Sequence, residues 1–323
     1  MTELRHRRNE AVLLASALIL LLLAALRPTI PMQRDIHTFL LVVDITQSMN
    51  TTDMQLGGKP ASRIAYSRHI LHDMVASMPC NTRVGVAIFA GVLVTTLFEP
   101  IEVCENFSSI QDTIAHLEWR QASHGNSRQG FGLLSAAGAV KTLREPAQVI
   151  FLTDGEEAPM LHAFNRADLS NWQGGRDWLL VGIGSDKPTP VPKMDENNKI
   201  IGYWSDTTYQ LEPGIAQVSD ETRLKRDDSI ATQDYERHLS KLDEAYLKSI
   251  ARQISAYYLR GDSLPALLAA LRQQSPTHRD RTPYNIHWLL AAIAGMLLIA
   301  AYLPHKPLTL LNRVIQNAIR RRT

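Results

Sequence analysis

The sequence predicts an α/β fold: a doubly wound, mostly parallel six-stranded sheet of Rossmann-like type, with one antiparallel edge strand and two flanking transmembrane helices. Three observations predict it. Short, wholly apolar runs alternate with longer stretches in which apolar residues recur at helical spacing. Two of these short runs stop abruptly at an aspartate, which is typical of strands that carry a site at their carboxyl ends. Two longer apolar segments lie near the ends of the chain.

Length and charge set the first limits. A chain of 323 residues has room for one large domain or two smaller ones. Its formal net charge of +2 gives no reason to expect a nucleic-acid partner.

The two apolar segments, 11–27 and 287–303, are each expected to span a membrane. Basic residues precede the first segment and follow the second, and positive flanks stay in the cytoplasm. We therefore expect residues 1–10 and the basic tail 304–323 in the cytoplasm of a bacterium, and residues 28–286 in the periplasm, against the inner membrane. A cleaved signal peptide is the alternative for the first segment, although its cleavage site is poor.

Strands and helices are expected to alternate between these segments, after a short linker at 28–37 and with a loop at 51–60. A polar excursion at 185–238 holds one further candidate strand, 200–204. The expected strands of the sheet are 38–43, 82–89, 92–98, 148–152, 178–183 and 256–259. The expected helices are 62–78, 105–117, 130–143, 242–254 and 263–271.

The two cysteines bear on whether the domain lies in an oxidising compartment. Gly91 marks a turn between the second and third strands. A hairpin about this turn places Cys80 and Cys104 nearly opposite each other beyond its open end. That arrangement favours a disulfide, which an oxidising periplasm permits, whereas two buried free thiols are the alternative.

Oxygen-bearing side chains follow the first strand at alternate positions. Asp44, Thr46 and Ser48 stand in a loop at its carboxyl end, where open α/β sheets bind ligands. One carboxylate and two hydroxyls supply half a coordination shell for a hard cation such as Mg²⁺. Turns and helix caps use the same residue types, so this loop alone is weak evidence.

The expected strand order brings further oxygen ligands to the same edge. In the order 3-2-1-4-5-6, the first and fourth strands are neighbours at the switch point. Asp44 ends the first strand and Asp154 follows the fourth, so the two acids are expected to face each other across one crevice. The loop that carries Ser127 leads into the helix before the fourth strand and can close over that crevice. Glu156 and Glu157 either tune this site or form a solvated acidic turn.

These residues resemble a known family. Asp44-x-Thr46-x-Ser48 is similar to the metal-ion-dependent adhesion site of von Willebrand factor A domains, normally Asp-x-Ser-x-Ser. The stretch 127–133, Ser-Arg-Gln-Gly-Phe-Gly-Leu, resembles the second element, Thr-x-x-Gly-x-Gly-Leu. Thr-Asp-Gly at 153–155 matches the third, and the resemblance covers about 36–273. Thr46 and Ser127 depart from the pattern but keep an oxygen ligand.

The resemblance implies a metal site and a kind of partner. Thr46, Ser48 and Ser127 would bind the cation directly or nearly so, and Asp44 and Asp154 would act mainly through water. The expected ion is Mg²⁺, or another divalent cation such as Ca²⁺ or Mn²⁺. One open position would accept an acidic side chain of a periplasmic protein partner through a charge-assisted bond.

A finer resemblance is to membrane-anchored bacterial members: the Bat aerotolerance proteins and, more closely, the accessory proteins of periplasmic methanol dehydrogenase. The stretches 44–50, 97–104 and 118–120 carry it. It implies assistance in assembling, maturing or loading calcium into a periplasmic enzyme, beside other accessory membrane proteins. The alternative is a Bat-type role in envelope stress or aerotolerance complexes.

Catalysis is the main rival interpretation. Phosphatases of the haloacid dehalogenase type need an acid where this chain has Thr46, and no Gly-x-Ser-x-Gly or Gly-Lys-Ser/Thr motif occurs. His69 and His72 share a helix spacing that a zinc site uses, but an ordinary amphipathic helix explains it. The cysteines are too far apart for Cys-x-x-Cys redox chemistry. We therefore expect a binding protein and no enzymatic activity.

Overall fold

The computed structural model divides the chain into two compact units: Asp35–His278, and the two ends Met1–Arg34 and Arg279–Thr323 taken together. The structure describes residues 2–121, 127–158, 161, 166–170, 172, 174–195, 197–204 and 239–302.

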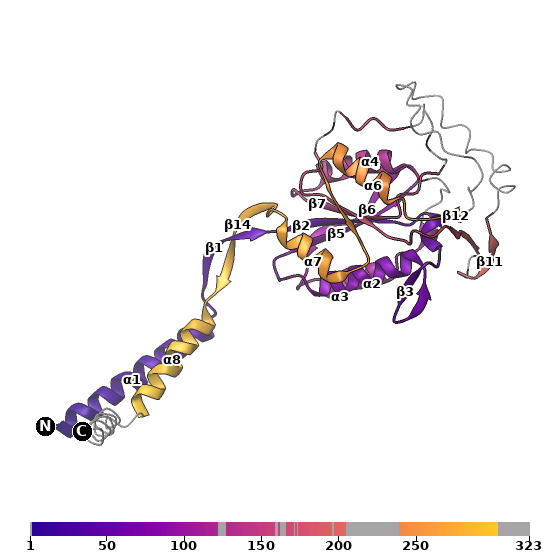
Figure 1. The fold of residues 1–323 in the computed structure, drawn as a ribbon. Helices are drawn as coiled ribbons and strands as arrows, with labels where there is room; N and C mark the ends of the chain where they lie inside the picture. Colours follow the sequence, from indigo (N-terminus) through magenta and orange to yellow (C-terminus); the bar gives the residue numbers. More distant parts are fainter. Residues whose placement is uncertain are drawn as a thin grey trace, which may run out of the picture. The chain divides into compact units, whose positions relative to one another are not determined.

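A six-stranded sheet forms the centre of the larger unit, in the order β13-β8-β7-β2-β5-β6 (Figure 1). Every neighbouring pair is parallel except β5 and β6, so β6 is an antiparallel edge strand. In chain order this is the predicted 3-2-1-4-5-6 arrangement, and the antiparallel edge strand is confirmed as well. The strands are β2 (Thr38–Asp44), β5 (Arg83–Ala90), β6 (Leu93–Glu102), β7 (Gln148–Thr153), β8 (Leu179–Gly182) and β13 (Tyr257–Arg260).

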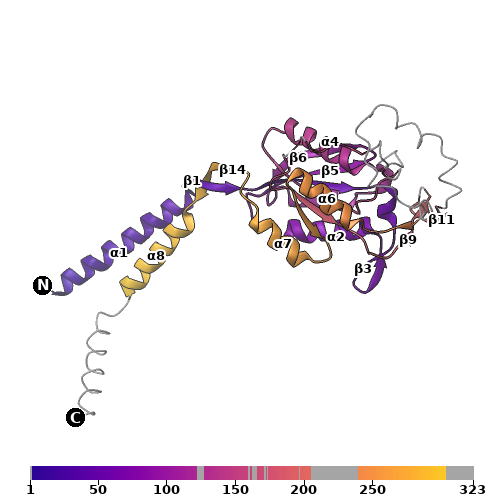
Figure 2. The same cartoon turned by 45° about the horizontal axis from the view of Figure 1, so that its top comes forward.

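Helices cover both faces of this sheet (Figures 1 and 2). One face is covered by α2 (Arg63–Ala76), α3 (Phe107–Ala115) and α7 (Leu264–Gln273). The other is covered by α4 (Gln129–Thr142) and α6 (Glu244–Ile254). These five helices agree with the predicted ones to within a few residues at each end, as expected where caps set the ends.

Burial on both faces explains why β2 is apolar from Phe39 to Val43. Phe39, Leu41 and Val43 pack into the core beneath α2, α3 and α7. Leu40 and Val42 alternate with them and pack into the core beneath α4 and α6. A central parallel strand has no solvent face, so its sequence shows no alternation of polar and apolar residues.

The hairpin of β5 and β6 turns at Gly91, with Ala90 facing Leu93. Beyond its open end, Cys80 and Cys104 form a disulfide with a Cα–Cα distance of 5.3 Å. The predicted pairing of the two cysteines is confirmed.

The predicted loop at 51–60 holds a small hairpin instead, of β3 (Met54–Leu56) and β4 (Lys59–Ala61). Its turn residues Gly57 and Gly58 both have positive φ, of 57° and 78°. A two-residue turn of this kind needs φ above zero at both positions, which glycine adopts without strain.

Further small strands occupy the polar excursion. β9 (Thr189–Pro190) pairs with β12 (Leu239–Ser240), and β10 (Pro192–Met194) pairs with β11 (Ile200–Tyr203). The strand expected at 200–204 is thereby confirmed. The part of the excursion from 205 to 238 lies outside the described residues.

The smaller unit corrects the expected linker at 28–37. Thr29–Ile36 is a strand, β1, which pairs with β14 (His278–Asn285). The two strands are about 240 residues apart in the chain, so no local sequence pattern shows this pairing.

The same unit contains two helices in contact, α1 (Thr2–Ala25) and α8 (His287–Tyr302). Among the described residues, no helix combines the length and the apolar character that a membrane crossing requires. The two transmembrane helices expected at 11–27 and 287–303 are therefore not confirmed.

Candidate metal centre

The candidate site lies where two central strands end. β2 and β7 are parallel neighbours, with Val43 facing Leu152. Asp44 is the last residue of β2, and Asp154 directly follows β7. Both aspartates are fully buried, at 0% exposure. The switch point predicted from the sequence therefore brings the two acids to the same edge of the sheet.

The first loop folds around the Asp44 carboxylate. Its Oδ1 accepts hydrogen bonds from the Thr46 backbone N–H (2.9 Å) and the Thr46 hydroxyl (2.6 Å). The hydroxyls of Thr46 and Ser48 lie 3.2 Å apart, because the chain enters a short 3₁₀ helix, η1 (Gln47–Asn50), directly after Thr46. The three oxygen-bearing side chains of this loop thus converge, as predicted.

Ser127 joins the site through a neighbour. The Gln129 amide donates to the Ser127 hydroxyl (3.0 Å) and to Asp44 Oδ2 (3.1 Å). The Ser127 backbone is fixed by paired hydrogen bonds with Ala158, at 2.9 and 2.8 Å. Gln129 was not among the predicted site residues, since its glutamine type alone gives no signal of a bridging role.

Thr153 completes the surroundings of Asp44. Its hydroxyl donates to Asp44 Oδ2 at 2.6 Å and accepts from the Gly155 backbone N–H at 3.0 Å. Each oxygen of Asp44 therefore has two hydrogen-bond donors. The Thr-Asp-Gly stretch pointed to this loop, but the sequence did not assign a role to its threonine.

Asp154 is held differently from Asp44. Its Oδ2 accepts from the buried guanidinium of Arg63 at 2.8 Å, and its Oδ1 accepts from the Glu156 backbone N–H at 2.9 Å. No local sequence pattern indicates a role for Arg63, which lies 91 residues away from Asp154 in the chain.

Buried acids give the site an excess of negative charge. Burial, and then the charge of Asp154, raise the pKa of Asp44 to about 6. The same two causes raise the pKa of Glu156 to about 8. Burial raises the pKa of Glu157 to about 7, although Tyr246 donates a hydrogen bond to it at 2.7 Å. Glu156 and Glu157 are therefore not a solvated acidic turn.

A divalent cation fits this donor set. The carboxylate, hydroxyl and amide groups that converge present oxygen ligands, which hard cations bind, and the guanidinium of Arg63 contacts Asp154 beside them. The raised pKa of Asp44 reflects a charge that a bound cation would offset. Within the described part of the chain, the side chains of Cys80, Glu102 and Cys104 also lie close together, but the disulfide already occupies both sulfurs.

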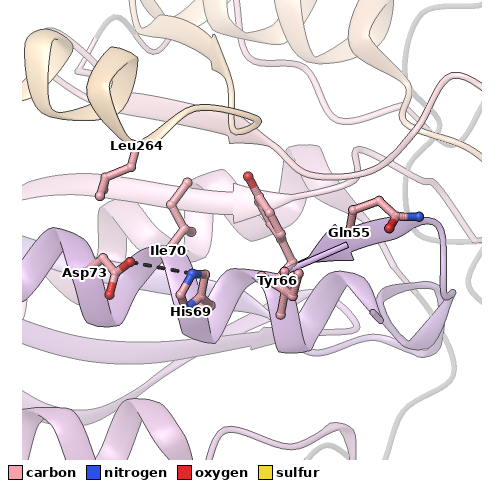
Figure 3. Close-up of a pocket in the computed structure, with 8 residues that line it drawn as sticks. Gln55, Tyr66, His69, Ile70, Asp73 and Leu264 are labelled. Carbon is pink, nitrogen blue, oxygen red and sulfur yellow. Dashed lines mark ion pairs between the residues drawn. The ribbon is translucent and has the colours of Figure 1, made fainter. Parts of the chain in front are cut away.

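The residues of the zinc alternative lie elsewhere. His69 and His72 are exposed and each contacts Asp73, at 3.5 and 3.1 Å. His69 and Asp73 line a small pocket of about 180 Å³ between the β3–β4 hairpin, α2 and the start of α7 (Figure 3). This pocket is lined by Gln55, Leu56, Gly57, Tyr66, His69, Ile70, Asp73 and Leu264, and includes no residue of the candidate metal site.

The fold and the site together define a class of protein: a doubly wound α/β domain with oxygen-bearing side chains from three loops gathered at the switch point of its sheet. Residues 39–157 match the family model of the von Willebrand factor type A domain.

Curated relatives are distant. A UPF0353 protein of Mycolicibacterium paratuberculosis is 24% identical over 224 residues, covering 62% of this chain and 63% of the relative. A UPF0353 protein of Nocardia farcinica is 25% identical over 253 residues, covering 68% of this chain and 70% of the relative. The chain thus spans about 63% of the length of the first of these relatives.

Solved structures to which the chain is similar include an aerotolerance-related membrane protein from Bacteroides fragilis and the conserved hypothetical protein BatB from Bacteroides thetaiotaomicron. The first has a TM-score of 0.48 at 17% identity and covers 74% of this chain and 98% of its own. The second has a TM-score of 0.49 at 17% identity and covers 73% and 98%.

Proposed function

We propose that this domain is a metal-dependent protein-binding module. One observation carries the proposal: a buried, negatively charged set of oxygen donors from three loops meets at the carboxyl edge of the sheet. Asp44 stands at its centre and is linked by hydrogen bonds to Thr46, Gln129 and Thr153. A site of this composition suits Mg²⁺, with Ca²⁺ or Mn²⁺ as alternatives.

The site residues would hold the ion in two ways, directly and through water. Thr46, Ser48 and Ser127 would offer hydroxyl oxygens, and Asp44 and Asp154 would act mainly through water. When bound, the cation supplies an open position for a carboxylate of the partner protein. That carboxylate forms a charge-assisted contact, which is stronger at a partly desolvated site than in water.

The surroundings of Asp44 support the proposal of a non-catalytic role. A nucleophilic aspartate needs an oxygen free to attack, whereas both oxygens of Asp44 already accept two hydrogen bonds each. The proposal therefore includes no hydrolase activity for this site.

The proposed setting is the periplasmic face of a bacterial inner membrane. It is supported by the basic flanks of the two apolar ends and by the disulfide, which an oxidising compartment permits. The finer resemblance of 44–50 and 97–104 supports a role in assembly, maturation or calcium loading of an enzyme such as methanol dehydrogenase. A Bat-type role beside other membrane proteins with this domain is the second candidate, and it rests on the same stretches.

Partner capture tests the proposal. The full chain, immobilised in mild detergent, is incubated with a periplasmic extract in Mg²⁺ or in EDTA, beside the Asp44→Ala variant. We expect an acidic partner to be retained in Mg²⁺ and lost both in EDTA and with the variant. Equal capture with and without EDTA would contradict the proposal. The identity of the retained protein decides between the two settings.

A further inference from the structure

Arg63 is a fully buried arginine beside the candidate metal site. It begins α2, directly after the capping residue Ser62. Its Nε donates to Asp53 Oδ1 at 3.0 Å and to Asp53 Oδ2 at 3.2 Å, and its Nη2 donates to Oδ2 at 2.7 Å. Its Nη1 donates to Asp154 Oδ2 at 2.8 Å and to the Ser240 hydroxyl at 2.6 Å.

The guanidinium of Arg63 lies in a closely packed slot. Gly184 has a φ of +137°, and a Cβ at this position would stand 2.9 Å from Arg63 Nε. Asp53 also accepts from the Ser185 backbone N–H at 3.0 Å, which ties the arginine's main partner to the loop after β8. Three segments that are distant in the chain thus fix one side chain. Burying a charge is costly unless it is paired, and Asp53 and Asp154 supply the two carboxylates that pair with Arg63.

Arg63 changes what Asp154 can offer to an ion. The guanidinium holds Oδ2, and the Glu156 backbone N–H holds Oδ1. The carboxylate is therefore turned toward fixed protein donors, and its negative charge is already partly neutralised. Asp44 has no such cationic partner among the contacts of the described residues, and its donors are uncharged hydroxyls, an amide and a backbone N–H.

Mg²⁺ and Ca²⁺ differ in how many carboxylates must be free to bind them directly. Mg²⁺ keeps several waters and needs only one or two carboxylates, whereas Ca²⁺ takes more oxygen ligands and favours carboxylates that bind it directly. A site with one restrained carboxylate therefore suits the smaller, more strongly hydrated ion.

We propose that Arg63 determines the metal specificity of this site: by holding Asp154 it withholds a direct carboxylate ligand and favours Mg²⁺ over Ca²⁺. The inference rests on the proposed metal-binding function. Arg63 acts through Asp154 and is a positioning residue. A purely structural role would alter stability but would leave the ratio of the two metal affinities unchanged.

The test compares Mg²⁺ and Ca²⁺ binding to the full chain by titration calorimetry. The main variant is Asp53→Asn/Arg63→Gln, which removes one charge of each sign and frees Asp154 Oδ2 from the guanidinium. Its ratio of Ca²⁺ to Mg²⁺ affinity is expected to rise at least about tenfold. The control is Arg68→Gln, which removes a charge from the same helix whose contacts are the carbonyls of Ala115 and Leu117 and no residue of the site, and its ratio is expected to stay within about twofold.

Each outcome of the titration either supports or overturns the role of Arg63 in metal specificity. A folded double variant with an unchanged ratio overturns the inference, as does a wild-type preference for Ca²⁺. If circular dichroism shows that the double variant is unfolded, Arg63→Lys takes its place, because a lysine keeps the charge but cannot grip Asp53 and Asp154 together. Arg63→Lys must then move the ratio in the same direction, and an unchanged ratio overturns the inference. A wild type that binds neither ion defeats the proposed function itself.

Discussion

Gln129 links two parts of the candidate site with a single amide group. Its Nε2 donates to both Ser127 and Asp44, so its loss would free the Ser127 loop from the Asp44 loop. Groups that orient the ligands of a metal typically change its affinity by about 10–100-fold when they are removed. We therefore expect Gln129→Ala to lower Mg²⁺ affinity by that factor while the domain stays folded. The control is Gln273→Ala, at an exposed position of α7, which should bind like the wild type in the same titration.

Three buried acids give the metal-free protein a defined pH dependence. The ordinary pKa is 3.8 for aspartate and 4.5 for glutamate, whereas Asp44, Glu157 and Glu156 reach about 6, 7 and 8 in the folded state. Between these values the folded state binds more protons than the unfolded state, so the free energy of unfolding falls as pH rises from about 4 to about 8. Melting temperatures measured in EDTA should therefore decrease from pH 5 to pH 8.

Added Mg²⁺ should raise the melting temperature more at pH 8 than at pH 5, because the cation binds the deprotonated acids. A melting temperature in EDTA that rises over this interval, or a larger Mg²⁺ effect at pH 5, would count against the charge distribution described for the site.

The sequence predicted the residues that form short local patterns but missed those whose role depends on distant contacts. Asp44, Thr46 and Ser48 share one loop, so their alternation is visible in the chain itself. Arg63 reaches Asp154 across 91 residues, and Gln129 reaches Asp44 across 85. An arginine at the start of a helix is normally solvated, and only the folded structure shows this one in a closed slot.

At the scale of elements, α4 packs so closely on the sheet that one of its glycines has no room for a side chain. A Cβ on Gly132 would overlap the ring of Phe89 in β5. Gly138 belongs to the same helix, and a Cβ there would meet nothing within 4 Å.

We expect Gly132→Ala to destabilise the protein by about 1–3 kcal/mol through overpacking. Gly138→Ala should instead stabilise it by about 0.5–1 kcal/mol, because alanine has the higher helix propensity. Chemical denaturation of the two variants measures both effects. Equal effects of the same sign would mean that α4 does not approach β5 as described.

The disulfide constrains the open end of the β5–β6 hairpin. Cys80 and Cys104 are separated by 24 residues, and closing a loop of this length stabilises a folded protein by about 3 kcal/mol. We expect a reductant to lower the free energy of unfolding by roughly that amount. Thiol labelling of the unreduced, denatured protein should find neither cysteine, and labelling of both would show that the bond is absent.

The strands that were not predicted have no periodic hydrophobic pattern in the sequence. β1 is exposed over most of its length and β14 is mostly polar, so neither segment shows alternation against a core, and the two pair across about 240 residues. β3 and β4 have three residues each, which is too short for a periodic signal, although Gly57 and Gly58 marked their turn. The buried strands were predictable, because a run such as Leu40–Val43 is unusual outside a sheet core.

At the scale of the whole molecule, the fold extends beyond the stretch that matches the family. The match ends at residue 157, but the sheet is completed by β8 and β13, and α6 covers its second face from further along the chain. The strand order was predictable because few topologies satisfy right-handed crossovers with short connections. The membrane spans and the periplasmic location stay predictions of the sequence.

The central claim is that the three loops at the switch point bind a divalent cation. Titration calorimetry of the full chain with Mg²⁺, beside Asp44→Ala, tests it most directly. We predict one Mg²⁺ site in the wild type and none in a variant that keeps the wild-type circular dichroism spectrum. Absence of Mg²⁺, Ca²⁺ and Mn²⁺ binding by the folded wild type, or unchanged binding by Asp44→Ala, would contradict the account.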